Sequence, residues 1–146
     1  MFRKLERKDK AIFLEMVHEM YHSEAVLEPI PASFMEATFQ ELMRSDEYLS
    51  CYLLCQEEKV AGYALLAKSF SPEAGGVVIW VEEIYVKKAF RSHGLGSAFL
   101  KEFIEHPPKD VKRIRLEVEP ENERAVGLYR RLGFKNLPYG QMVIDY

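Results

Sequence analysis

One stretch of the sequence, residues 75–106, constrains the fold more than any other. Its first part, "GGVVIWVEEIYV", is rich in β-branched and aromatic residues, which predicts a strand. A turn containing glycines follows and leads into a helix whose core side is expected to hold Leu95, Phe99, Phe103 and Ile104. A strand that leads through a short turn into an amphipathic helix is typical of domains that pack helices against a central sheet.

The residues before this stretch predict a mixture of helices and strands. Their hydrophobic patterns indicate a short strand over 2–7, a helix over 8–22 and two strands over 48–55 and 60–67, joined by a tight turn. Ser33 and Glu36 form a capping-box pattern, which predicts a second helix that begins at Ser33. Its apolar side is expected to carry Phe34, Phe39, Leu42 and Met43.

The residues after this stretch predict three further elements. "RIRLEVEP" alternates between apolar and charged residues, so we expect a strand with Ile114, Leu116 and Val118 facing inward. Asn122 is expected to cap a helix that Gly133 ends. "QMVIDY", residues 141–146, predicts a last strand. The whole chain, residues 1–146, is therefore expected to form a single domain of the α/β (α+β) class.

Composition excludes some classes of function. The chain is 48% hydrophobic and 29% charged, with a formal net charge of −3. A protein that binds nucleic acid along its surface is usually basic, so no nucleic-acid partner is expected. No apolar run approaches the ~18–20 residues that span a bilayer, and the charged N-terminus has no apolar segment behind it. We therefore expect a cytoplasmic protein without a membrane partner.

A zinc-protease pattern, H-E-x-x-H, occurs at residues 18–22. At ~100° per residue, the His18/His22 pair lies roughly 160° around the helix from its apolar stripe, so both rings are expected to face solvent beside Glu15. A zinc site also needs a third ligand. We expect no functional metal site here, although the pattern leaves adventitious binding of nickel or zinc by this pair open.

The cysteines, Cys51 and Cys55, lie four residues apart on a predicted strand. That spacing separates them by about 13 Å, beyond the roughly 7 Å between bridged Cα atoms. They are expected to be small buried apolar residues, with a catalytic cysteine as the alternative.

The turn before the predicted helix over 95–106 has the features of an anion site. Gly94 and Gly96 remove side chains where the backbone approaches another group. The first N–H groups of a helix lack partners within the helix and lie at the positive end of its dipole, which suits a phosphate group. Nearby basic residues form an island in an acidic chain: Lys87, Lys88, Arg91 and His93.

Three phosphate-binding patterns compete for this turn. A Walker A loop needs a lysine after its second glycine, and none is present. A dinucleotide-binding G-x-G-x-x-G turn would need glycine at position 99, where the chain has Phe99. The third pattern, R-x-x-G-x-G, is satisfied by Arg91, Gly94 and Gly96. This segment resembles the pyrophosphate-binding motif of the GNAT superfamily, the acetyl-CoA-dependent N-acetyltransferases.

The resemblance covers roughly residues 77–135. Beyond the motif, "LEVEPENERAVGLYRRLGF" is similar to the family's following strand and Asn-capped helix, with matching residues at Asn122, Ala125, Tyr129, Gly133 and Phe134. Ser92 departs from the pattern, since glycine is commoner at that position. The resemblance implies a mixed central sheet flanked by helices, with a central strand whose end splays from its neighbour. Dimers are frequent in this family, so a homodimer is compatible with the resemblance.

By resemblance, the cosubstrate is acetyl-CoA. The residues implied in binding it are Ile84, Tyr85, Val86, Arg91, Ser92, His93, Gly94, Leu95, Gly96, Ser97, Asn122, Ala125 and Tyr129. Ile84 and Val86 would contribute backbone contacts to the pantetheine arm.

The chemistry of acetyl transfer needs a base, because a protonated amine is not a nucleophile. Glu82 and Glu83 lie at the expected position on the splayed strand, and the family pattern favours Glu82, with Glu83 or a water molecule as alternatives. A backbone N–H such as that of Ile84 is the candidate oxyanion donor. Tyr129 is implied as the group that protonates or hydrogen-bonds to the leaving thiolate.

The acceptor pocket is implied to include the segment between the first two helices, residues 23–33. Glu24 and Glu28, together with Glu82, would suit a cationic amine, and Trp80 could form a wall of the pocket. We expect a small amine resembling a polyamine or an aminoglycoside. The alternatives are a protein lysine or N-terminus as acceptor, and a non-catalytic acyl-CoA-binding regulatory domain.

Overall fold

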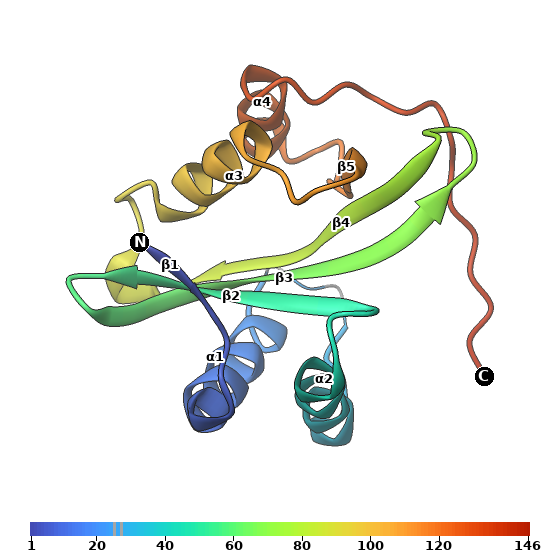
Figure 1. Cartoon of the computed structure of the whole chain (residues 1–146). Coiled ribbons are helices and arrows are strands. Elements are labelled where there is room, and N and C mark those ends of the chain that lie inside the picture. Colours follow the sequence, from blue (N-terminus) through green and yellow to red (C-terminus); the bar gives the residue numbers. More distant parts are fainter. Residues whose placement is uncertain (25, 27) are drawn as a thin grey trace.

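The computed structural model of the chain describes residues 1–24, 26 and 28–146. These residues form a five-stranded sheet with strand order β1-β2-β3-β4-β5, covered by helices on both faces (Figure 1). The strands are β1 (Phe2–Lys4), β2 (Leu49–Gln56), β3 (Lys59–Ser71), β4 (Gly76–Val86) and β5 (Val111–Leu116). The first four strands pair antiparallel, and β5 pairs parallel to β4. The predicted mixed sheet is confirmed.

Two helices, α1 (Lys10–Tyr21) and α2 (Ala32–Arg44), lie on one face of the sheet (Figure 1). A 3₁₀ turn over Arg7–Asp9 precedes α1. The core on this face contains Phe13, Met16, Phe39, Leu53 and Tyr63, each with no more than 1% of its surface exposed. Burial of large apolar side chains of this kind is the main contribution to the stability of such a domain.

The other face of the sheet carries α3 (Leu95–Glu105) and α4 (Glu123–Arg131) (Figure 1). Phe99 and Phe103 of α3 stack with ring centroids 5.7 Å apart and pack above the sheet. A second 3₁₀ turn, over Lys88–Phe90, joins β4 to the loop before α3. The β4–α3–β5 connection therefore brings two parallel strands side by side under one helix.

Three sequence-based predictions about the elements are wrong. Helix α2 begins at Ala32, because Pro31 has an extended conformation at the N-cap position, so Ser33 lies inside the helix and does not cap it. Met35 occupies the buried position, whereas Phe34 is 59% exposed, since consecutive helical residues point ~100° apart. Strand β5 ends at Leu116, which leaves Val118 exposed beyond the sheet.

The predicted strand over residues 141–146 is also absent. Residues 135–146, all of which the structure describes, form neither helix nor strand. After α4 the chain runs in an extended path to the β3–β4 hairpin, passes it and continues beyond the sheet to the C-terminus (Figure 1). A strand needs a hydrogen-bonding partner, and this segment does not pair with any strand of the described sheet.

Candidate active site

The site begins where β4 and β5 separate. Their parallel ladder ends at the pair Val81 and Leu116, while β4 stays paired with β3 as far as Val86. The last residues of β4 therefore have one edge that no strand of the described chain covers. This is the splayed strand that the family resemblance implies, and it opens the sheet beside α3 and α4.

A β-bulge lies at the same place. Leu65 of β3 pairs with Glu83, but its neighbour Leu66 pairs with Val81, so Glu82 is the extra residue. A bulge redirects side chains relative to simple alternation. Its effect here is that Glu82 and Glu83 have different environments despite being adjacent.

Glu83 lies among aromatic side chains on the α1 face of the sheet. Its carboxylate accepts a hydrogen bond of 2.5 Å from the Tyr21 hydroxyl and one of 2.8 Å from the Tyr63 hydroxyl. Burial, followed by the nearby carboxylate, raises the pKa of both phenols, so both stay protonated donors at neutral pH. The phenols fix the orientation of Glu83.

Glu82 faces an acidic surrounding and remains accessible to solvent. Desolvation by neighbouring protein atoms raises the pKa of its carboxyl above the ordinary value, and the charges of Glu117 and Glu83 raise it further. Glu117 follows β5 directly, so its effect on Glu82 acts across the gap between the separated strands. A carboxylate with a raised pKa is a stronger base than an ordinary one.

The N-terminus of α3 is built for close backbone approach. Gly94 precedes the helix with φ of 70°, a left-handed conformation that favours glycine, and it offers no side chain to cap the first turn. The first helical hydrogen bond runs from the Ala98 amide to the Gly94 carbonyl at 2.9 Å. The amides of Leu95, Gly96 and Ser97 come before it and have no partner in the ladder of the helix.

Gly96 has a different role from Gly94. A Cβ atom at Gly96 would lie 3.3 Å from Cγ2 of Ile84, whereas a Cβ at Gly94 would meet nothing within 4 Å. Gly96 therefore lets α3 pack closely on the splayed end of β4. Gly94 instead supplies the backbone conformation that starts the helix.

The loop before Gly94 is tied to the end of β4. Arg91 donates a hydrogen bond from Nε to the Val86 carbonyl at 2.9 Å, and its guanidinium lies 5.6 Å from the centroid of the Tyr85 ring. Ser92 has φ of 67°, a conformation that costs a non-glycine residue roughly 1–2 kcal/mol. The family's preference for glycine at this position thus matches a backbone requirement.

A cavity of about 290 Å³ gathers many of the predicted cosubstrate residues. Its lining includes nine of them: Ile84, Val86, Arg91, Ser92, Gly94, Leu95, Gly96, Ser97 and Tyr129. Four others do not line it: Tyr85, His93, Asn122 and Ala125. Residues that the sequence reasoning missed complete the wall: Phe90, Leu100, Arg124 and Leu128.

The elements that carry them explain why Tyr85, Asn122 and Ala125 do not line this cavity. Tyr85 points into the opposite core, where its hydroxyl donates to Glu19 at 2.9 Å. Asn122 caps α4 as predicted, accepting a hydrogen bond of 3.1 Å from the Ala125 amide. Arg124 lies one helical turn before Leu128, and this i, i+4 spacing is the signal that could have identified it.

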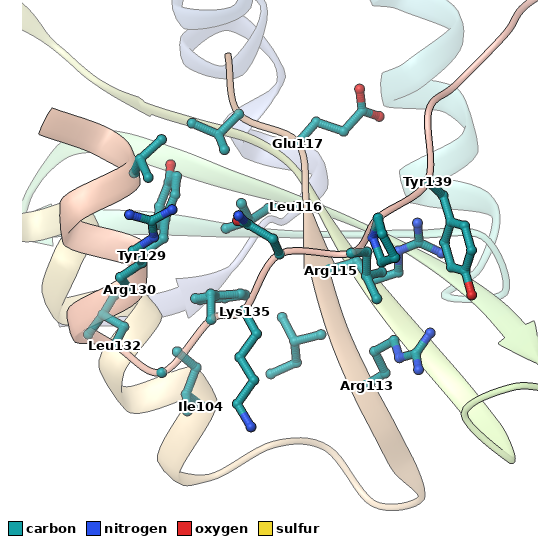
Figure 2. Close-up of a pocket in the computed structure, with 18 of the residues that line it drawn as sticks. Ile104, Arg113, Arg115, Leu116, Glu117, Tyr129, Arg130, Leu132, Lys135 and Tyr139 are labelled. Atoms are coloured by element: carbon teal, nitrogen blue, oxygen red, sulfur yellow. The ribbon is translucent and has the colours of Figure 1, made fainter. Parts of the chain in front are cut away.

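Tyr129 connects this cavity with a larger one. Its ring is half-buried and packs edge-on against Phe134, with centroids 5.8 Å apart. Burial raises the pKa of its hydroxyl, which keeps the phenol protonated. Tyr129 also lines a second cavity of about 1080 Å³ between β5, α4 and the C-terminal segment, together with Glu117 (Figure 2).

The predicted acceptor residues Trp80, Glu24 and Glu28 do not line either of the two cavities. Trp80 packs against Arg115, whose guanidinium lies 4.1 Å from the ring centroid. Glu24 and Glu28 are exposed, and neither lines the two cavities. The segment over residues 23–33 also contains Ala25 and Leu27, which lie outside the described residues.

The two histidines of the zinc-protease pattern lie on the exposed side of α1. His18 and His22 are exposed, as the helical phase predicts, and their rings stack with centroids 4.0 Å apart. Glu19, the glutamate of this pattern, accepts a hydrogen bond from the Tyr85 hydroxyl. Among the described residues, no group of three potential ligands is placed to hold a metal ion.

Two further predictions concern the cysteines and the membrane. Cys51 and Cys55 are both buried free thiols, and burial raises the pKa of Cys51, which disfavours the reactive thiolate.

Among the described residues, every helix is too short or too polar to cross a membrane.

Comparisons with known proteins agree with this geometry. The family model described as Acetyltransferase (GNAT) family matches residues 14–134. Thialysine N-epsilon-acetyltransferase of Bos taurus is 31% identical over 94% of this chain and 85% of that protein. Spermine/spermidine N(1)-acetyltransferase of Bacillus subtilis (strain 168) is 28% identical over 56% of this chain and 57% of that protein.

The fold has close structural neighbours as well. The crystal structure of a possible acetyltransferase from Clostridium difficile 630 superposes with a TM-score of 0.83 at 17% identity. The superposition covers 100% of this chain and 97% of that one. The splayed strand, the helix that Gly94 begins and the family match together lead to one conclusion: the chain is an acetyltransferase that belongs to the GNAT family.

Proposed function

We propose that the protein transfers an acetyl group from acetyl-CoA to the primary amine of a small cationic molecule of the polyamine type. The observation that carries this proposal is the uncapped N-terminus of α3, which opens into the same cavity as Tyr129 and the splayed end of β4. The names of the relatives, which act on thialysine, spermine and spermidine, support a small amine with more than one charge. The expected cytoplasmic location stays a prediction.

The residues around the smaller cavity fit coenzyme A. The amides of Leu95, Gly96 and Ser97 suit the pyrophosphate, because bare N–H groups at a helix N-terminus bind phosphate oxygens. Arg124 adds positive charge at the wall of the same cavity. The uncovered backbone edge from Ile84 to Val86 suits the amide-bearing pantetheine arm. On this edge the Val86 carbonyl already accepts from Arg91, and the Ile84 N–H is the candidate donor.

The three nearby carboxylates have different roles in the proposed reaction. Glu82 acts as the base that takes a proton from the ammonium group, directly or through water, since its pKa is raised toward neutrality and it is open to solvent. Glu83 is a positioning residue, held by two phenols, that adds negative charge beside the acceptor. Glu117 adds a third carboxylate and thereby favours a cationic acceptor over a neutral one.

Two donors complete the reaction. Acetyl-CoA supplies the acetyl group as a thioester. In the proposed reaction the Ile84 N–H stabilises negative charge on the carbonyl oxygen, which lowers the barrier to attack by the amine. The Tyr129 hydroxyl hydrogen-bonds to the departing sulfur, and its raised pKa makes stabilisation by hydrogen bonding more favourable than complete proton transfer.

The experiment that tests this function is an acceptor screen that measures thiol release from acetyl-CoA. The panel contains spermidine, thialysine, an aminoglycoside, a lysine-containing peptide and a peptide with a free N-terminus. We expect the multiply charged small amines to give the highest kcat/KM. Coenzyme A binding without thiol release for any amine would favour a regulatory binding domain, and preference for the peptides would favour a protein acceptor.

A further inference from the structure

The end of β4 has different contacts on its two faces. Beyond the bulge its side chains alternate between the faces of the sheet, as in any strand. Ile84 and Val86 line the smaller cavity beside α3. The residues that alternate with them each contact a side chain of α1: Glu83 with Tyr21, Tyr85 with Glu19 and Lys87 with Glu15. Helix α1 therefore holds the segment whose other face meets the proposed cosubstrate.

Tyr85 is the middle of these three contacts, and it is 8% exposed. Its hydroxyl donates a hydrogen bond of 2.9 Å to Oε2 of Glu19. Burial raises the pKa of this hydroxyl and the bond to Glu19 raises it further, so it stays a protonated donor at neutral pH. Strand β3 also approaches the Tyr85 backbone closely, because a Cβ atom at Gly62 would lie 2.1 Å from the Tyr85 carbonyl oxygen. The ring is therefore fixed at both ends, by the sheet and by Glu19.

The Arg91 guanidinium lies over this ring, 5.6 Å from its centroid. A cation in this position is attracted by the negative charge on the face of an aromatic ring. Arg91 is held at a second point as well, since its Nε donates to the Val86 carbonyl at 2.9 Å. Arg91 lines the smaller cavity, whereas Tyr85 does not. Tyr85 can therefore influence that cavity through Arg91.

The loop that begins with Arg91 contains strained backbone. Ser92 has φ of 67° and Gly94 has φ of 70°, and a serine rarely adopts this left-handed conformation. Strained backbone persists only where the surrounding contacts hold it in place. The two contacts of Arg91 tie the start of this loop to the end of β4. A firmly held Arg91 therefore favours the loop conformation that leads into α3.

We propose that Tyr85 and Glu19 are positioning residues for coenzyme A, which hold Arg91 so that the loop over residues 91–94 is preformed for the pyrophosphate. The inference rests on the proposed binding of coenzyme A and adds two residues that lie outside its cavity. A preformed loop binds a ligand more tightly than a mobile one, because less conformational freedom is lost on binding. The expected effect of both residues is therefore on the affinity for coenzyme A.

Calorimetric titration with coenzyme A tests the inference. Tyr85→Leu removes the ring face and should raise the Kd about tenfold. Tyr85→Phe keeps that face and loses only the bond to Glu19, so its Kd should rise no more than about threefold, as should that of Glu19→Gln. Phe39→Leu removes a ring from the same core, away from Arg91, and is the matched control. Its Kd should equal that of the unaltered chain.

A double-variant cycle shows whether Tyr85 acts through Arg91. When Arg91→Ala is already present, adding Tyr85→Leu should change the Kd by less than about twofold, because the contact between the two side chains is already lost. If Tyr85→Leu does not fold, Glu19→Gln replaces it in the same cycle, with the same expectation. Losses that multiply in the double variant would overturn the inference.

Two other results would overturn it while leaving the proposed function intact. One is a Kd for Tyr85→Leu, or for Glu19→Gln in its place, that equals that of the unaltered chain. The other is an equal rise in Kd for Phe39→Leu, since the loss would then follow from general destabilisation of the core. A complete lack of coenzyme A binding by the unaltered chain would instead overturn the proposed function and this inference together.

Discussion

The Glu83 carboxylate accepts a 2.5 Å hydrogen bond from the Tyr21 hydroxyl, and this contact joins the end of α1 to the bulged part of β4. The two residues are 62 positions apart in the chain. Together with the bond from Tyr63, the contact holds Glu83 in one orientation while Glu82, the adjacent bulge residue, stays free of such constraints. Because of this difference, we propose Glu82 as the base and Glu83 as a positioning residue.

The first prediction compares the two isosteric variants Glu82→Gln and Glu83→Gln. Glu82→Gln should lower kcat at least tenfold at neutral pH, because it removes the base that deprotonates the amine. Glu83→Gln should lower the free energy of unfolding by about 1–2 kcal/mol, because two charge-assisted hydrogen bonds become neutral ones. Thiol-release kinetics and urea unfolding of both variants provide the measurement. Activity losses in the reverse order would assign the base to Glu83.

The second prediction uses the charge of Glu117. Glu117 contributes to the raised pKa of Glu82, so Glu117→Gln removes a repulsive charge and should lower that pKa. The base is active when deprotonated, and the acid limb of the kcat/KM profile should therefore move to lower pH. Glu121→Gln, an exposed carboxylate nearby in sequence that does not contribute to this pKa, is the control. An acid limb unchanged by Glu117→Gln would rule out Glu82 as the group that controls it.

The third prediction concerns the hydroxyl of Tyr129. Tyr129→Phe should lower kcat at least tenfold and leave coenzyme A affinity nearly unchanged, because the ring that fills the cavity wall remains. Tyr139→Phe removes a hydroxyl that bonds to Glu73 instead, so it should retain kcat. Steady-state kinetics with calorimetric binding separates the two effects. An unaltered kcat in Tyr129→Phe would exclude a role for this hydroxyl in releasing the thiolate.

The fourth prediction uses a pair of glycines with the same backbone strain. Gly94 and Gly75 have φ of 70° and 78°, and a Cβ at either one would meet nothing within 4 Å. Valine should therefore strain the backbone similarly at both positions. Gly94→Val should abolish measurable coenzyme A binding, whereas Gly75→Val, in the β3–β4 hairpin, should retain it. Equal affinity in both variants would contradict the assignment of the α3 N-terminus.

Local pattern predicted most of the fold. The strand over β4, the helix after Gly94, the Asn122 cap and the left-handed Gly133 all follow from residues within one element. The pattern could not show that β5 stops at Leu116 or that residues 141–146 leave the sheet, because strand pairing depends on distant partners. The predicted start of α2 was wrong for a local reason, because Pro31 and not Ser33 occupies the N-cap position.

Some parts of the candidate site could be predicted from the sequence, and others could not. The motif from Arg91 to Gly96 identified the cavity beside α3. The phenols that hold Glu83 were not foreseen, because Tyr21 and Tyr63 approach it only through tertiary packing. The bulge that separates the environments of Glu82 and Glu83 is likewise a property of the paired strands, so the sequence could not decide between the two carboxylates.

The central claim is that the bare amides at the start of α3 bind a pyrophosphate. A crystal structure of the protein with coenzyme A tests this claim most directly. We predict phosphate oxygens within about 2.7–3.2 Å of the amide nitrogens of Leu95, Gly96 and Ser97. A pyrophosphate bound away from residues 91–97 would contradict the account.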